Sequence, residues 1–243
     1  MIRMVSGGAT NAGRVRSHNE DAFLDAPDRK LWVVADGMGG HSAGDVASAM
    51  IVERMGKVSP DADMATFVDT VDRELSGVNE ALRKHAQERN VSLIGATVVA
   101  MLGGADFAAI GWAGDSRAYR FKDGKLQRLS RDHSTAQEMM DTGQFTAAQL
   151  AGKQQGNTIT RAVGGEVDLF LDWVVAGFEP GTQFLLCSDG LTKEVPEPKI
   201  EEEFKKGLAP KELADTLVSA ALAAGGRDNV TVVVVRAEGA SSQ

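Results

Sequence analysis

The sequence has a single cysteine, few aromatic residues and no long apolar run. Cys187, the one cysteine in 243 residues, cannot form a disulfide within the chain, which agrees with a reducing compartment. Aromatic residues make up only 5% of the chain, and no segment approaches the roughly 18 uninterrupted apolar residues of a membrane-spanning helix. The stretch MIRMVSGGATNAGR lacks the apolar core of a secretory signal. We therefore expect one cytoplasmic globular domain over residues 1–243, without a membrane span.

The sequence also lacks a basic surface of the kind that binds nucleic acid. Asp and Glu number 34 against 26 Lys and Arg, which gives a formal net charge of -8 at pH 7 and a sequence pI near 5.1. This balance argues against nucleic acid as a partner, because such proteins need a positively charged stripe. If several of the carboxylates hold divalent cations, the working charge is smaller than the formal one.

The spacing of apolar residues predicts blocks of strands separated by helices. Helices are expected behind a capping box at Ser42–Asp45, from Met64 to Leu82, from Glu197, and over 210–224. Residues 133–156 are rich in Gln, Thr, Gly and Ala and are expected to open with a helix and to form a flap-like excursion over the surface. This order favours an α+β layered domain with helices outside a mostly antiparallel sheet core. Strands are expected at 22–24, 31–35, 95–102, 106–114, 117–129, 168–178, 182–189 and 230–237.

Three Asp-Gly pairs lie at or between the expected strands, and they differ in their surroundings. Asp123 stands between Lys122 and Lys125 in a polar stretch, which is typical of a type I′ hairpin turn. Asp36 and Asp189 instead follow the apolar runs LWVVA and FLLCS, with no basic residue beside them in the sequence. A carboxylate at the end of a buried strand is costly unless a cation meets it. These two pairs therefore favour a metal site over a turn.

Two further carboxylates lie at strand ends beside small residues. Asp115 follows one expected strand in GWAGDSR, and Asp228 precedes another in GGRDNVTVVVV. Each alone is explained by a turn or a cap, but four carboxylates converging on one edge would repel each other unless cations were present. The backbone carbonyl of Gly37 could approach such an ion. The scattered histidines do not favour zinc, so the donors indicate Mg²⁺ or Mn²⁺.

Three other motifs that bind or cleave phosphate groups can be excluded, because the sequence lacks one required residue of each. A dinucleotide fingerprint that starts at Gly37 lacks its last glycine. A phosphate-binding loop that starts at Gly39 has Asp45 where lysine must reach the phosphates. A thiol phosphatase needs an arginine six residues after its cysteine, and Cys187 has Lys193 there. We interpret Cys187 as a core residue.

Taken together, the motifs resemble those of the metal-dependent protein phosphatases of type 2C, which dephosphorylate phosphoserine and phosphothreonine in proteins. DGMGGH and the short chain are similar to the bacterial branch, whose members usually oppose a Hanks-type Ser/Thr kinase. The resemblance implies a four-layer αββα sandwich: two central antiparallel β-sheets with helices on both outer faces. The motifs occur in order over nearly the whole chain: RSHNED (16–21), ADGMGGHSAG (35–44), GATVV (95–99), GDSR (114–117), NTITRAVG (157–164), SDGL (188–191) and RDNVTVV (227–233).

The resemblance implies two Mn²⁺ or Mg²⁺ ions, a third and weaker ion, and one arginine that binds the substrate phosphate. A water shared by two ions about 3.5 to 4 Å apart would attack phosphorus in line, without a phosphoenzyme. The implied site residues are Asp36 as the bridging and catalytic ligand, Gly37 through its carbonyl, Asp189 and Asp228 for the second ion, Glu20 through water, Asp115 with Asp189 for the third ion, and Arg16 as the catalytic phosphate clamp.

The general acid and the substrate remain open. Many eukaryotic relatives carry a histidine where this chain has Met38, and His41 is the nearest substitute, although metal-bound water could also protonate the leaving group. One alternative function is a pseudophosphatase, a module that binds phosphoproteins without turnover. Another is a metal phosphatase that acts on small metabolites. We expect a monomer, with phosphoproteins as substrates and a Ser/Thr kinase as the opposing partner.

Overall fold

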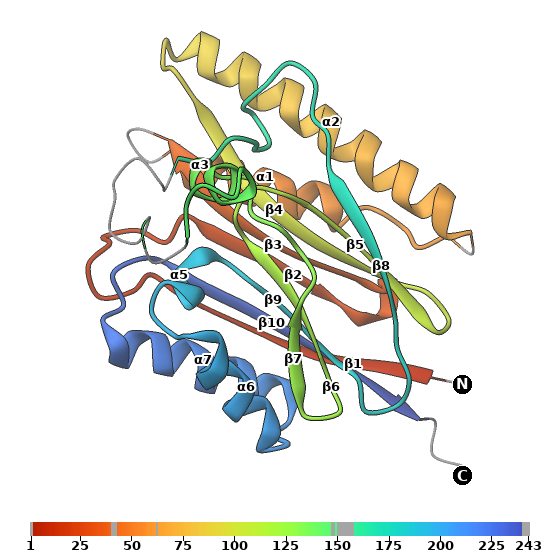
Figure 1. The fold of residues 1–243 in the computed structure, drawn as a ribbon. Helices are drawn as coiled ribbons and strands as arrows, with labels where there is room; N and C mark the ends of the chain where they lie inside the picture. Colours follow the sequence, from red (N-terminus) through yellow and green to blue (C-terminus); the bar gives the residue numbers. More distant parts are fainter. Residues whose placement is uncertain (1, 40–42, 62, 147–148, 150–157, 240–243) are drawn as a thin grey trace.

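The computed structural model describes residues 2–39, 43–61, 63–146, 149 and 158–239, and its strands form two five-stranded antiparallel sheets (Figure 1). One sheet has the order β1-β10-β9-β6-β7 and the other β2-β3-β4-β5-β8. The strands are β1 (Ile2–Asn11), β2 (Asp21–Ala26), β3 (Leu31–Gly39), β4 (Ile94–Gly103), β5 (Phe107–Ala113), β6 (Arg117–Lys122), β7 (Lys125–Arg128), β8 (Asp172–Gly177), β9 (Gln183–Cys187) and β10 (Val230–Gly239).

Helices cover the outer face of each sheet, so the molecule has four layers (Figure 1). Helices α1 and α2 pack on the second sheet, and α6 and α7 cover the first. The predicted αββα sandwich is confirmed. The helical segments are η1 (Pro27–Arg29), α1 (Gly44–Met55), α2 (Met64–Glu88), α3 (Thr135–Asp141), α5 (Asp189–Thr192), α6 (Glu197–Lys205) and α7 (Pro210–Ala224).

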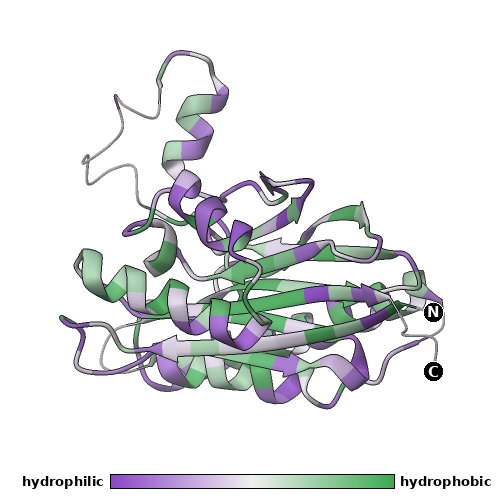
Figure 2. Ribbon diagram, turned by 90° about the horizontal axis from the view of Figure 1, so that it is seen from below, coloured by the Kyte–Doolittle hydropathy of each residue, from purple (hydrophilic) through white to green (hydrophobic). Residues whose placement is uncertain are grey.

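The central strands are apolar on both faces because each face meets a different layer. On β3, Trp32 and Val34 pack between the two sheets, whereas Leu31, Val33 and Ala35 pack against α1 and α2. Successive side chains of a strand point to opposite faces, so a strand buried on both sides must be apolar throughout. Figure 2 shows the resulting concentration of hydrophobic residues along the strands, with polar residues gathered on the helices and loops.

Several element boundaries differ from the sequence expectation. Helix α1 begins at Gly44, and its cap residue Ala43 makes no side-chain cap hydrogen bond. Ser42, the first residue of the expected capping box, lies outside the described residues. The predicted strand at 182–189 ends at Cys187, because Asp189 is the first residue of the short helix α5. The expected strand at 168–178 is shorter, Asp172–Gly177.

The two ends of the sandwich carry different features. Ile2 pairs with Gly239, so β1 starts and β10 finishes at the same end. Figure 1 shows α3 and α5 at the opposite end, where the loops between strands gather. Residues 147–148 and 150–156 of the expected flap lie outside the described part. Within that part, no helix combines the length and apolar character needed to cross a membrane.

Candidate metal centre

The end of the sandwich near α5 brings together five buried or half-buried aspartates. Asp36 interacts electrostatically with all four of the others, although they come from separate strand ends and loops. Four members were expected from the sequence, and Asp21 is the addition. We call this set the acid cluster: Asp21, Asp36, Asp115, Asp189 and Asp228.

Asp36 lies at the centre of the acid cluster and inside a strand rather than at its end. It is paired across the sheet with Asp21 on β2 and with Thr97 on β4. Burial raises the pKa of Asp36 well above its usual value, and the neighbouring aspartates raise it further, Asp21 most of all. Such a carboxylate is stabilised in its ionised form only when positive charge is supplied nearby.

Asp21 is 8% exposed and is held by a hydroxyl group from the residue that follows β9. Ser188 donates its Oγ–H to Asp21 Oδ2 over 2.8 Å. Asp21 Oδ1 is buried and has no hydrogen-bond partner among the described residues. Burial raises the pKa of Asp21 to about 7; hydrogen bonds from Thr231 and Ser188 lower it, and the charges of Asp189 and Asp228 raise it.

Asp115 follows β5 in a tight turn that two neighbours hold in place. Its preceding residue, Gly114, has φ +118°, and an added Cβ there would lie 2.5 Å from Thr97 Cβ. The Gly114 N–H donates to His133 Nδ1 over 3.1 Å. Burial raises the pKa of Asp115 to about 7, and Asp189 is the next contributor. The charges of Asp115 and Asp189 therefore act on each other in this part of the acid cluster.

Asp189 and Asp228 form ion pairs with basic side chains. Lys193 forms an ion pair with Asp189 Oδ2 and approaches Asp228 Oδ2 at 3.4 Å. Burial raises the pKa of Asp189, while Lys193 lowers it. Asp189 Oδ1 stays buried and unpartnered within the part of the chain that the structure describes. One oxygen of Asp189 is thus available to a further cation.

Glu20 and Gly37 lie beside the acid cluster where β2, β3 and the start of α1 meet. The Gly37 N–H donates to the Glu20 carbonyl over 3.0 Å. A Cβ on Gly37 would lie 2.1 Å from the Gly44 carbonyl oxygen, so only glycine fits here. A Cβ on Gly44 would lie 2.9 Å from the Glu20 carboxylate, which places that carboxylate at the N-terminus of α1. The partial positive charge of a helix N-terminus stabilises it there.

Arg16 extends from the loop that precedes β2 and contacts the acid cluster at its exposed side. Its Nε lies 2.9 Å from Asp228 Oδ1, and its side chain is 54% exposed. This ion pair uses the Nε atom of the guanidinium group. The other N–H donors of the group form a planar fork that suits a phosphate. Arg16 is therefore both close to the carboxylates and reachable from solvent.

Asn229 fastens the loop that carries Arg16 and Glu20. Its Oδ1 accepts the Glu20 N–H over 2.8 Å, and its Nδ2 donates to the carbonyls of Ala12 and His18, each over 2.9 Å. Asn229 is 6% exposed, so these bonds are made away from water. One side chain next to Asp228 thus fixes three backbone groups of that loop.

The oxygen donors of the acid cluster suit hard divalent cations. Three buried carboxylate oxygens, on Asp21, Asp115 and Asp189, have no hydrogen-bond partner among the described residues. Unpaired buried carboxylate oxygens beside other carboxylates are expected where a cation binds. Still, no three acidic, His or Cys side chains of the described residues form a ready-made metal cage. Lys193 forms an ion pair with Asp189, and Arg16 forms one with Asp228. Gly37 would contribute to a metal site through its backbone carbonyl and not through a side chain.

Two residues of the centre were missed from the sequence, and each had a detectable signal. Asp21 directly follows Glu20, and it lies opposite Asp36 once β2 and β3 are paired in a hairpin. Lys193 is four residues after Asp189, the spacing at which side chains meet on one helix face. Met38, which stands where many eukaryotic relatives carry a histidine, is half-buried in β3. His41, the nearest substitute for a general acid, lies outside the described residues.

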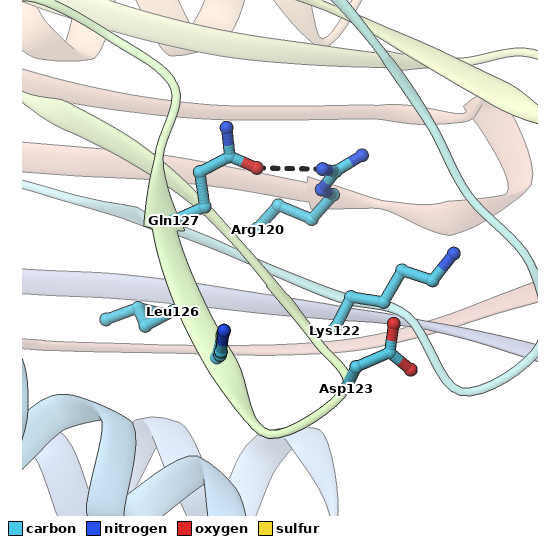
Figure 3. Close-up of a pocket in the computed structure, with 6 residues that line it drawn as sticks. Arg120, Lys122, Asp123, Leu126 and Gln127 are labelled. Carbon is cyan, nitrogen blue, oxygen red and sulfur yellow. Dashed lines mark hydrogen bonds between the residues drawn. The ribbon is translucent and has the colours of Figure 1, made fainter.

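The remaining Asp-Gly pair forms the turn that the sequence predicts. Asp123 and Gly124 have φ values of +52° and +74°, as a type I′ turn requires. An open pocket of about 620 Å³ lies beside this hairpin (Figure 3), and no residue of the acid cluster lines it. It is lined by Arg120, Lys122, Asp123, Lys125, Leu126 and Gln127.

Comparison with solved structures places the fold among bacterial serine/threonine phosphatases. PppA, described as a key regulatory component of T6SS in Pseudomonas aeruginosa, superposes with a TM-score of 0.89 at 39% identity, covering 97% of this chain and 98% of that one. The catalytic domain of the phosphatase PstP, in complex with two manganese ions, superposes with a TM-score of 0.88 at 29% identity, covering 98% of this chain and all of that one.

Sequence comparison identifies the family. The profile of the family described as Protein phosphatase 2C matches residues 10–224. A serine/threonine phosphatase, stp, from Listeria welshimeri is 34% identical over 234 residues, which is 93% of each chain. The chain therefore belongs to the protein phosphatase 2C family. The enzyme class expected from the sequence, a metal-dependent protein phosphatase, is confirmed.

Proposed function

We propose that this protein hydrolyses phosphoserine and phosphothreonine in proteins with the acid cluster as its two-metal centre. The observation that carries the proposal is the convergence of four aspartates on Asp36, with three buried carboxylate oxygens of the cluster unpaired among the described residues. The proposed metal ligands are Asp36 between the two ions, the Gly37 carbonyl for one ion, Asp189 and Asp228 for the other, and Glu20 through water. Asp115 with Asp189 would hold a third, weaker ion.

When bound, two Mn²⁺ or Mg²⁺ ions would lower the pKa of a coordinated water and so supply a nucleophile near neutral pH. The chain's own residues place the substrate and the ligands. Arg16 is exposed beside Asp228 and binds the phosphoryl oxygens, where negative charge builds up as the ester bond breaks. Asn229 keeps Arg16 and Glu20 in place through the loop that carries both. Asp21 lies opposite Asp36 in the strand register and accepts a hydrogen bond from Ser188.

This chain has Met38 where many eukaryotic relatives carry a histidine, so the leaving serine or threonine needs another source of a proton. Met38 cannot transfer a proton, so the proton for the departing alkoxide would come from water at the centre. We further propose that residues 1–243 act as one catalytic domain in the cytoplasm, as a monomer. In this proposal the segment 133–156 shapes access of the substrate, and a Ser/Thr kinase supplies the phosphorylated protein.

The test is release of phosphate from a phosphothreonine peptide under four conditions. We expect turnover with Mn²⁺, none with EDTA, and none for Asp189→Asn in Mn²⁺. Asp123→Asn serves as a matched control, because Asp123 belongs to an Asp-Gly pair with a turn role only, and it should keep full activity. Activity that survives both EDTA and Asp189→Asn would contradict the metal mechanism.

Two further outcomes separate the alternative functions. Folded wild-type protein without turnover on any phosphopeptide, yet with measurable affinity for it, would indicate a pseudophosphatase. Faster turnover of sugar phosphates than of phosphopeptides would indicate a metabolite phosphatase. The proposal expects the reverse preference, with the phosphopeptide as the better substrate.

A further inference from the structure

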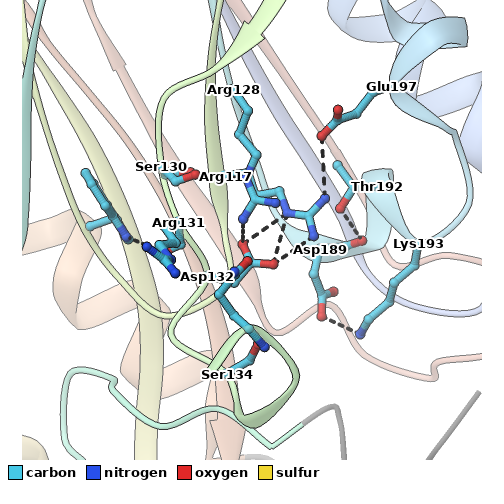
Figure 4. A network of polar contacts seen from close by, with 12 residues as sticks. Arg117, Arg128, Ser130, Arg131, Asp132, Ser134, Asp189, Thr192, Lys193 and Glu197 are labelled. Carbon is cyan, nitrogen blue, oxygen red and sulfur yellow. Dashed lines mark hydrogen bonds and ion pairs between the residues drawn. The ribbon is translucent and has the colours of Figure 1, made fainter. Parts of the chain in front are cut away.

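Lys193 places a positive charge on the two carboxylates that the proposed second metal ion would need. Its ammonium group pairs with Asp189 Oδ2 (Figure 4). It also lies 3.4 Å from Asp228 Oδ2. Asp189 and Asp228 come from α5 and from the loop before β10, so Lys193 bridges two separate elements. No other Lys, Arg or His of the described residues forms an ion pair with Asp189.

The position of Lys193 is set by the backbone. The Lys193 N–H donates to the Asp189 carbonyl over 2.8 Å, which closes one helical turn between the two residues. Residues four apart on a helical turn present their side chains to each other. The ion pair is therefore built into the SDGLTK stretch and does not depend on a distant loop.

The exposure of the two partners is unequal. The Asp189 side chain is only 14% exposed, whereas the Lys193 side chain is 45% exposed. A lysine has four flexible methylene groups, so its ammonium can leave the carboxylate for solvent without a change in the backbone. Asp189 cannot move away in the same manner, because burial fixes its carboxylate beside Asp115 and Asp228.

A divalent ion and the Lys193 ammonium would compete for the same carboxylates. Both are attracted by Asp189 and Asp228, and they repel each other at short range in a partly buried site. Without any cation, the repulsion among the aspartates and their burial would destabilise the fold. A resident ammonium lowers that cost and at the same time weakens binding of the metal.

We propose that Lys193 is a built-in counter-cation that stabilises the metal-free protein and sets the metal affinity of the second site. The inference rests on the proposed function, because it takes Asp189 and Asp228 as metal ligands. In this arrangement Lys193 leaves the carboxylates when the ion binds. The enzyme then loads at a higher Mn²⁺ concentration than its carboxylates alone would require.

The experiment compares Mn²⁺ affinity and metal-free stability of the wild type, Lys193→Met and Lys193→Arg. Methionine is unbranched and of similar length but carries no charge. We expect Lys193→Met to bind Mn²⁺ about tenfold more tightly by calorimetry. In EDTA its melting temperature should fall by about 3 °C or more. Lys193→Arg should stay within about threefold of the wild-type affinity, since it keeps the charge.

Lys205→Met is the matched control. Lys205 pairs with Glu201 at the same i,i+4 spacing, over 2.5 Å on α6, and its side chain is 49% exposed. Its substitution should leave Mn²⁺ affinity unchanged. It removes a helix ion pair of the same kind without touching the acid cluster.

Unchanged or weaker Mn²⁺ binding by Lys193→Met would overturn the inference, because Lys193 would then be neutral or would help to place Asp189 for the metal. If the wild type binds Mn²⁺ and cleaves the phosphopeptide while Lys193→Met shows no gain in affinity, only this inference fails. If the wild type binds no Mn²⁺, the proposed function fails and the inference fails with it.

Discussion

Asp21 on β2 and Asp36 on β3 occupy directly opposed positions in the strand register. Asp25, on the same face of the hairpin, differs from this pair because Ser6 and Trp32 both donate hydrogen bonds to it. Directly opposed like charges destabilise a sheet, and burial adds to the cost. The pair therefore destabilises the fold when both carboxylates are ionised. Its protonation should raise the free energy of unfolding of the metal-free protein.

The first prediction concerns that stability and pH. The pKa of Asp21 is raised to about 7 in the folded protein, from 3.8. A raised pKa means that the native state binds more protons than the unfolded state between these values, so this group destabilises the fold progressively as pH rises from about 4 through about 7. In EDTA, Asp21→Asn should be more stable than the wild type by at least about 1 kcal/mol at pH 8 and equal to it near pH 4.

Urea unfolding of both proteins at a series of pH values measures this difference. Asp123→Asn is a suitable control, since Asp123 lies at a hairpin tip and its substitution should give no pH-dependent difference. An Asp21→Asn variant that is less stable than the wild type at pH 8 would show that Asp21 is stabilised as a carboxylate by something other than a bound metal.

The second prediction concerns the backbone at Gly37. Gly37→Ala would place Cβ 2.1 Å from the Gly44 carbonyl oxygen and 2.5 Å from that of Glu20. Because both contacts are to backbone, the β3–α1 junction must shift, and we expect a loss of about 3 kcal/mol in the free energy of unfolding together with weaker Mn²⁺ binding. Gly177→Ala is the matched control, because the nearest atom to its Cβ is 4.0 Å away. Equal stability of the two variants would contradict the packing described here.

The third prediction concerns Cys187. This residue is fully buried in β9 and packs with the α6 and α7 layer. Burial raises the pKa of the Cys187 thiol to about 12, and only the thiolate is reactive. A thiol reagent such as dithionitrobenzoate should therefore label the native protein far more slowly than the urea-unfolded protein. Rapid labelling of the native protein with loss of phosphatase activity would point to a catalytic thiol.

The layered fold could be predicted from the sequence because its signals are local. The five apolar positions Leu31 to Ala35 indicate a strand buried on both faces, and Phe67, Val71 and Leu75 recur with the spacing of a helix that buries one face. The turn at Asp123-Gly124 is specified by the two residues themselves. In each case the residues that form the element are also those that carry its pattern.

The centre could be predicted only in part because its contacts join distant segments. Asp36, Asp115, Asp189 and Asp228 each stand beside small residues at or near strand ends, which marked them singly. The opposition of Asp21 to Asp36 depends on the register of β2 and β3, and the bond from Asn229 to Glu20 joins residues 209 positions apart. The pairing of Lys193 with Asp189 depends on the helical turn of α5, which begins at Asp189 where the sequence predicts the end of a strand.

The central claim is that Asp36 joins two metal ions, and counting bound Mn²⁺ tests it most directly. Calorimetric titration of the wild type and of Asp36→Asn, with folding of both checked by circular dichroism, would measure the number of ions and their affinities. We predict two tightly bound Mn²⁺ per chain in the wild type, apart from the weaker third ion. In Asp36→Asn we predict loss of high-affinity binding at both sites, because one carboxylate would serve both ions. Two ions bound to Asp36→Asn with wild-type affinity would contradict the claim.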